Sequence, residues 1–189
     1  MELDKAIKER HSVRSFKKGI KIDYKKIIDI VEAGRYAPAA GNAVCTKYIM
    51  VWDKDKIREL GEASQQKFVG DAEWIIVVCS DKQFIKKLYL DRTDKYTKQQ
   101  AGASIENMLL KTVDLGLASC WIGAFSDEIV RRVLRIPDDV EVEALLPIGK
   151  QMGKTKEQYK PDPEGIYYFN EWKNKHLEGR KPMPPGSST

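Results

Sequence analysis

The chain has 189 residues, 42% of them hydrophobic, which is enough for one globular core but too few for two full-sized domains. No run approaches the ~18 consecutive apolar residues of a membrane span, and the first residues lack a secretory signal, so we expect a soluble, cytoplasmic protein with no membrane partner. Three isolated cysteines and only two histidines argue against a disulfide framework, a zinc site or another metal centre.

The formal net charge of +5 is unevenly distributed. Residues 1–26 hold nine Lys/Arg against four Asp/Glu and residues 147–189 hold eight against five, whereas the middle of the chain is acidic. If the two basic ends meet in the fold, they could form an anion site. A nucleic-acid face usually needs a denser basic stripe with interleaved aromatics, so we expect no nucleic-acid partner.

Hydrophobic periodicity predicts helices mixed with short strands. The expected helices cover residues 3–10, 23–34, 55–63, 99–115 and 126–134. The expected strands cover residues 48–52, 74–79, 117–125 and 141–148. Pro38 and the Gly-Asn pair that ends at Asn42 mark a loop over residues 37–42.

Two further segments have no strong periodicity. Residues 81–98 are charged, with Phe84, Tyr89 and Tyr96 scattered among lysines, and could be a helical excursion or a mobile lid. Residues 178–189 are expected to be a disordered tail, because Pro, Gly and Ser cannot bury enough apolar surface to offset chain entropy. We therefore expect a single domain over residues 1–177.

The segment between the first two expected helices holds a candidate anion site. Arg10, Ser12 and Arg14 place two guanidinium groups and a hydroxyl within five residues, and this set suits a phosphate dianion. The alternative, favoured by composition alone, is that the arginines solvate a helix end and pair with Glu9 or Asp23.

Other catalytic and nucleotide motifs are missing or incomplete. Residues 149–155 resemble a P-loop, but they have one residue too few between the glycines and lead into prolines instead of a helix. No G-x-G-x-x-G supports a Rossmann site. Neither histidine is a natural base for a nucleophile, and Cys120 falls in an expected strand, where we expect it to be buried. This pattern points to chemistry carried by a bound cofactor.

Three motifs in register resemble the flavin-dependent nitroreductase family. They are RHSVRSF from Arg10, APAAGN from Ala37, and ENMLL from Glu106 followed by GLASCWIG from Gly116. The resemblance spans about residues 3–172. It implies an α+β fold with a central, mainly antiparallel sheet wrapped by helices, an intertwined homodimer, and two FMN sites at the subunit interface. A monomer would be expected to expose the apolar helix around Met108.

The resemblance also assigns flavin contacts. Phosphate and ribityl contacts fall on Arg10, Ser12 and Arg14, with His11 between them and Lys160 as the C-terminal basic match. The flavin lining supplied by the partner falls on Pro38, Ala39, Ala40 and Asn42. Gln66 matches a polar contact to the pyrimidine edge, or is a solvated loop glutamine. The backbone of Ile122, Gly123 and Ala124 would pass the flavin, with an N–H near N5.

The implied activity is that of a flavin oxidoreductase. NAD(P)H would pass hydride to flavin N5 and leave before a nitroaromatic, quinone or similar small acceptor takes the electrons, which gives ping-pong kinetics without a catalytic side chain. Phe84, Tyr89 and Tyr96 could select the acceptor or simply pack. The alternatives are a non-catalytic FMN-binding or storage protein, a flavin-fragmenting or dehalogenating relative of the same fold, and a protein-interaction domain without a cofactor.

Overall fold

The computed structural model describes residues 1–154 and 159–175, and the chain divides into two compact units. The first unit spans Met1–Thr155 and the second begins at Lys156. In the second unit, Asp162 caps the short helix α7 (Pro163–Ile166) by accepting from the N–H of Glu164. The tail at 178–189 lies outside the described residues, and a single domain over 1–177 stays a prediction.

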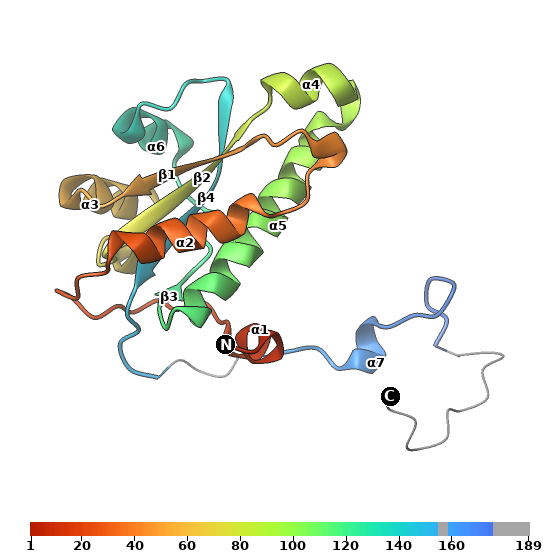
Figure 1. Cartoon of the computed structure of the whole chain (residues 1–189), viewed down its shortest axis with the longest axis horizontal. Helices are drawn as coiled ribbons and strands as arrows, with labels where there is room; N and C mark the ends of the chain where they lie inside the picture. The colour runs from red at the N-terminus through yellow and green to blue at the C-terminus, as the bar shows by residue number, and fades with distance from the viewer. Residues whose placement is uncertain (155–158, 176–189) are drawn as a thin grey trace. The chain divides into compact units, whose positions relative to one another are not determined.

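The first unit is built on a four-stranded antiparallel sheet in the order β1-β2-β4-β3 (Figure 1). The strands are β1 (Thr46–Val51), β2 (Trp74–Asp81), β3 (Ala118–Ser119) and β4 (Val140–Gly149). The α+β fold with an antiparallel sheet is therefore as predicted. The two central strands are almost wholly buried, which explains their dense apolar sequences.

The third predicted strand, 117–125, is much shorter than expected. After Ser119 the ladder with β4 stops, and it returns only at Ile122, whose N–H and C=O both pair with Leu145 at 3.0 Å. In the register between these pairs, Cys120 faces Pro147, which has no N–H to donate. The proline therefore interrupts the ladder and frees the segment around Cys120.

Helices cover both faces of this sheet. They are α1 (Leu3–Glu9), α2 (Tyr24–Arg35), α3 (Lys54–Ala63), α4 (Gln83–Tyr89), α5 (Thr93–Asp114) and α6 (Asp127–Leu134), with three 3-10 turns, η1 (Ala40–Asn42), η2 (Lys67–Val69) and η3 (Leu90–Arg92). Asp23, Asp53 and Ser126 cap α2, α3 and α6 with side-chain oxygens. Among the described residues, no helix is long and apolar enough to cross a bilayer.

The helical alternative for residues 81–98 is confirmed. This segment forms α4, η3 and the first turns of α5, which begins at Thr93 instead of Gln99. Lysines and aspartates fill these turns and obscure the apolar periodicity, because only isolated positions such as Ile85 and Thr97 are buried.

Successive side chains of the central strands point to opposite faces of the sheet and pack into two separate hydrophobic cores. On one face, Ile75 and Val77 of β2 pack with Ile57 of α3 and Val130 of α6. On the other face, the cluster joins α2 and α5 to the sheet; its fully buried members include Ile30, Ile76, Val78, Ile105, Met108 and Leu146.

Helices α2 and α5 approach closely at Gly34. A Cβ on Gly34 would lie 2.8 Å from Ser104 Oγ and 2.9 Å from Met108 Cγ, so a larger residue would force these α5 side chains to shift. Met108 itself has no exposed surface. The expectation that a monomer exposes the helix around Met108 was wrong, because α2 and the sheet bury that residue within a single chain.

Candidate functional site

The extended segment Arg10–Arg14 runs beside β3. The N–H of Val13 donates to the C=O of Ser119 at 2.9 Å, and the Val13 side chain is buried in the core. Because side chains alternate along an extended chain, Ser12 and Arg14 face away from this core. The local geometry therefore presents the predicted polar residues on one side of the segment.

The polar residues of this segment have different partners. Arg10 Nε lies 3.3 Å from Glu106 Oε1 of α5, so its partner is neither Glu9 nor Asp23. Ser12 hydrogen-bonds the thiol of Cys120, and Arg14 is exposed. The pairing of Arg10 with Glu106 was not predicted, since no spacing rule relates residues so far apart in the chain.

Cys120 is buried behind this polar segment, as predicted. Burial raises the pKa of its thiol, and the charge of Arg14, the hydrogen bond from Ser12 and the charge of Arg10 oppose that shift without cancelling it. The thiol therefore stays protonated at neutral pH and is not a nucleophile.

His11 is held within the chain through both ring nitrogens. Nδ1 lies 2.6 Å from the C=O of Glu9 and Nε2 lies 3.1 Å from Oε1 of Gln151. These contacts fix the turn at the end of α1, and a direct contact of His11 with a cofactor stays a prediction.

Ile122, Gly123 and Ala124 continue from β3 along the same edge of the sheet. Ile122 is buried, whereas Gly123 and Ala124 are exposed. A Cβ on Gly123 would meet no described atom within 4 Å. Packing within the described chain therefore gives no reason for a glycine here.

Gln66 adjoins this edge. It is half-buried at the start of η2, and its N–H donates to the C=O of Gly61 and to Oγ of Ser64, both at 3.3 Å. The C=O of Ala63 accepts from the N–H of Ser126 at 2.9 Å, which joins this turn to the segment after Ala124. A contact of Gln66 with a cofactor beside this segment stays a prediction.

The predicted Pro38–Asn42 loop lies elsewhere in the first unit. It precedes β1, at the opposite edge of the sheet, and packs beside α4 and the start of α5, whereas β3 lies next to the far end of α5 (Figure 1). Pro38 and Asn42 are exposed, and Ala39 and Ala40 are half-buried. One chain therefore does not bring this loop to the Arg10–Arg14 segment.

Lys160 is exposed and belongs to the second unit. Its meeting with the Arg10–Arg14 segment stays a prediction.

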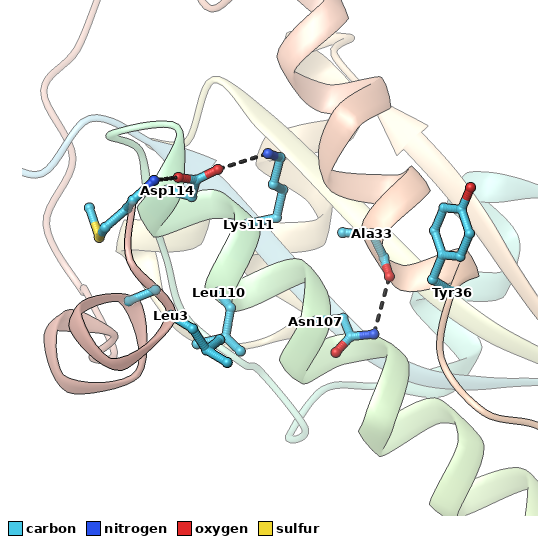
Figure 2. A pocket seen from close by; sticks show the side chains of 9 residues that line it. Leu3, Ala33, Tyr36, Asn107, Leu110, Lys111 and Asp114 are labelled. Atoms are coloured by element: carbon cyan, nitrogen blue, oxygen red, sulfur yellow. Dashed lines mark hydrogen bonds and ion pairs between the residues drawn. The ribbon is translucent and has the colours of Figure 1, made fainter. Parts of the chain in front are cut away.

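A cavity of about 380 Å³ between α1, α2 and α5 contains none of the predicted site residues (Figure 2). At one end Asp114 accepts from Lys111 Nζ at 2.7 Å and from the amino group of Met1 at 2.6 Å. These two contacts, that of Lys111 first, lower the pKa of Asp114 to about 2. The remaining lining is mostly apolar, with Leu3 and Leu110 facing each other.

Known proteins resemble this chain in both sequence and structure. A provisionally named NADH dehydrogenase/NAD(P)H nitroreductase of Archaeoglobus fulgidus is 29% identical over 168 residues, which cover 84% of this chain and 93% of the relative. A crystal structure with the same provisional name, from Parabacteroides distasonis, is 26% identical with a TM-score of 0.78, covering 90% of this chain and 98% of that one.

An FMN-dependent nitroreductase of Clostridium difficile has the same fold. Its TM-score is 0.75 at 24% identity, with 88% of this chain and 98% of that one covered. The sequence model of the nitroreductase family matches residues 7–68 and 60–150, which together make up most of the chain. The chain therefore belongs to the nitroreductase family.

Proposed function

We propose that this protein is an FMN-dependent oxidoreductase that takes hydride from NAD(P)H and delivers electrons to a small acceptor such as a nitroaromatic or a quinone. Family membership and the names of the relatives support an NAD(P)H-dependent enzyme. The observation that carries the proposal is the polar segment Arg10–Arg14, whose Val13 N–H donates to Ser119 of β3, the strand that leads to the exposed Gly123.

The donor set of this segment fits the phosphate of FMN. Two guanidinium groups and a hydroxyl suit a dianion, and Glu106, which pairs with Arg10, offsets only one of the two positive charges. No pyrophosphate-binding glycine motif is present, which favours FMN over FAD. Arg10, Ser12 and Arg14 would hold the phosphate, and the backbone from Ile122 to Ala124 would pass the ring.

The side chains around this site would bind and orient the FMN. When bound, FMN would supply hydride transfer at its N5 atom. Cys120 lies behind this segment, and its buried, protonated thiol contributes no thiolate. We therefore assign no catalytic side chain. If the nicotinamide and the acceptor use one cavity in turn, ping-pong kinetics follow.

The position of the Pro38–Asn42 loop supports a site shared by two copies of the chain. In one chain this loop and the Arg10–Arg14 segment lie at opposite edges of the sheet. Both can contact one cofactor only if the loop comes from a second copy. A homodimer is therefore part of the proposal.

Anaerobic stopped-flow reduction of the purified protein tests the function. We expect NADH or NADPH to bleach the flavin absorbance and a nitroaromatic or quinone to restore it. Colourless protein that takes up no FMN would contradict the cofactor. Protein that binds FMN but is not reduced by either nicotinamide would be a binding or storage protein, and halide release or flavin fragmentation would identify a different reaction on the same fold.

A further inference from the structure

Tyr89, the last residue of α4, is seated against Gly41 of the Pro38–Asn42 loop. A Cβ on Gly41 would lie 2.3 Å from Tyr89 Oη and 3.3 Å from its Cζ. The phenol end thus occupies the space that any larger residue would need. Gly41 also has φ of +54°, a conformation that favours glycine. A larger residue at this position would therefore have to displace the end of the Tyr89 side chain and adopt a strained backbone.

Tyr89 is in turn held by neighbouring aromatic and apolar groups. Its ring meets that of Tyr96 edge-on, with centroids 4.9 Å apart and planes at 87°. Both tyrosines pack against a small core of the buried Ala43, Cys45 and Ile85. For these two tyrosines the packing alternative holds, and α4 and α5 share a core with the loop.

A buried polar contact ties the end of the loop to α5. The backbone N–H and the thiol of Cys45 both donate to Oε1 of Gln100, at 3.3 and 2.8 Å. Burial raises the pKa of the Cys45 thiol, so it remains a donor at neutral pH. Residues 39–45 therefore contact both helices of the α4–η3–α5 segment, α4 through Tyr89 and α5 through Gln100.

Ion pairs fix that helical segment to β4. Lys82 pairs with Asp94 at 2.6 Å and with Glu141, and Lys98 pairs with Glu143 at 2.8 Å and also with Glu141. The Glu143 side chain is only 5% exposed whereas that of Lys98 is 50% exposed, so this pair is partly shielded from solvent. The network joins α4, α5 and the central sheet.

We propose that residues 82–100 form a fixed brace that sets the conformation of residues 39–45, with Tyr89 as the positioning residue at Gly41. In the two-copy site described above, the shape of this loop determines how one copy meets the flavin held by the other. The link to flavin rests on the proposed function, whereas the link from Tyr89 to the loop does not.

Hydrogen–deuterium exchange of the cofactor-free protein tests the brace directly. In Tyr89→Ala we expect exchange at residues 39–45 to quicken about tenfold while β2 and β4 keep their protection, because local opening need not unfold the sheet. Tyr89→Phe keeps the ring and should restore most of the protection. Leu88→Ala, an exposed neighbour on α4, is the matched control and should change nothing.

FMN titration and the visible circular dichroism of bound flavin test the link to the cofactor. Tyr89→Ala should raise the FMN dissociation constant about tenfold, within the usual range of coupling between sites, and alter the dichroism. Gly41→Ala should do the same, and adding Gly41→Ala to Tyr89→Ala should weaken FMN binding less than Gly41→Ala does in the wild type, because the hydroxyl no longer blocks the new methyl group.

The outcomes separate the two proposals. Unchanged exchange at 39–45 in both Tyr89→Ala and Gly41→Ala overturns the brace. Faster exchange with unchanged FMN affinity and dichroism overturns the positioning role. If the wild-type protein binds no FMN, the proposed function fails, and the exchange experiment alone then decides whether Tyr89 sets the loop.

Discussion

Arg14 differs from Arg10 because its guanidinium is exposed and has no carboxylate in an ion pair among the described residues. In Arg14→Ala we expect FMN binding to weaken by about 1.5–3 kcal/mol, the usual value of a charge-assisted hydrogen bond. Titration of apoprotein with FMN, followed by quenching of flavin fluorescence, measures the change.

Two variants serve as controls for Arg14→Ala. Arg58→Ala removes an exposed arginine of α3 and should leave FMN affinity unchanged. Glu106→Gln should tighten binding, by about 0.5–1 kcal/mol, because it releases Arg10 and removes a negative charge from the phosphate region. If Arg14→Ala and Arg58→Ala change the FMN affinity equally, Arg14 does not contact the phosphate and only interacts with solvent.

Gly123 is expected to affect flavin binding and not the stability of the cofactor-free protein. Because a Cβ there meets no described atom within 4 Å, Gly123→Val should not lower the melting temperature of the cofactor-free protein. It should weaken FMN binding or slow reduction per bound flavin, since the added side chain would occupy the space left for the ring. Thermal melts and stopped-flow reduction measure the two effects separately.

Cys120→Ser is the control for Gly123→Val. It changes a buried thiol that carries no proposed chemistry, so the reduction rate per bound flavin should stay near that of the wild type. Loss of reduction in Cys120→Ser with normal FMN content would contradict the absence of a catalytic side chain. If Gly123→Val instead lowers the stability of the cofactor-free protein, this glycine is needed for a bend in the strand and not for space near the flavin.

At the scale of elements, two helical glycines should respond oppositely to alanine. In α3 a Cβ on Gly61 would lie 2.8 Å from the backbone N of Gly70, which cannot move aside without shifting the turn. Overpacking should outweigh the gain in helix propensity, so Gly61→Ala should lower the free energy of unfolding by about 1–2 kcal/mol.

In α5, Gly102 has only an ordinary contact to Trp121, so Gly102→Ala should raise the free energy of unfolding by about 0.5–1 kcal/mol. Denaturant unfolding compares the pair, and the same sign for both would refute the packing argument.

Elements were predictable wherever the sequence itself carries the cause. The apolar run of β2 and the caps Asp23 and Ser126 place their elements, and the family resemblance supplied the fold and the family, both confirmed. The break opposite Pro147 depends on pairing partners that sequence patterns do not reveal.

Candidate-site residues were identified by motif, but their surroundings were not. The Arg10–Glu106 ion pair and the contact of Tyr89 with Gly41 join positions far apart in the chain. No periodicity or spacing encodes such contacts, because they arise only when the sheet brings the two segments together.

At the scale of the whole molecule, we expect a dimer even at sub-micromolar concentration. The two parts of the proposed site lie at opposite edges of one sheet, and α1 and α2 expose Leu3, Ile7 and Ile28. Obligate interfaces bury on the order of 2,000 Å² or more and do not dissociate readily on dilution. Sedimentation velocity measures the mass, and a stable FMN-loaded monomer would contradict the shared site.

Because all three cysteines are buried, the rate at which each thiol reacts reports local unfolding of the segment around it. Cys45, Cys79 and Cys120 are each at most 2% exposed, and burial raises the pKa of each thiol, that of Cys79 to about 11. An alkylating reagent can therefore react only after the surrounding segment opens. In native buffer we expect Cys79, in a central strand, to be labelled last. Mass spectrometry of the alkylated peptides would rank the stability of the segments around Cys45, Cys79 and Cys120 without any mutation.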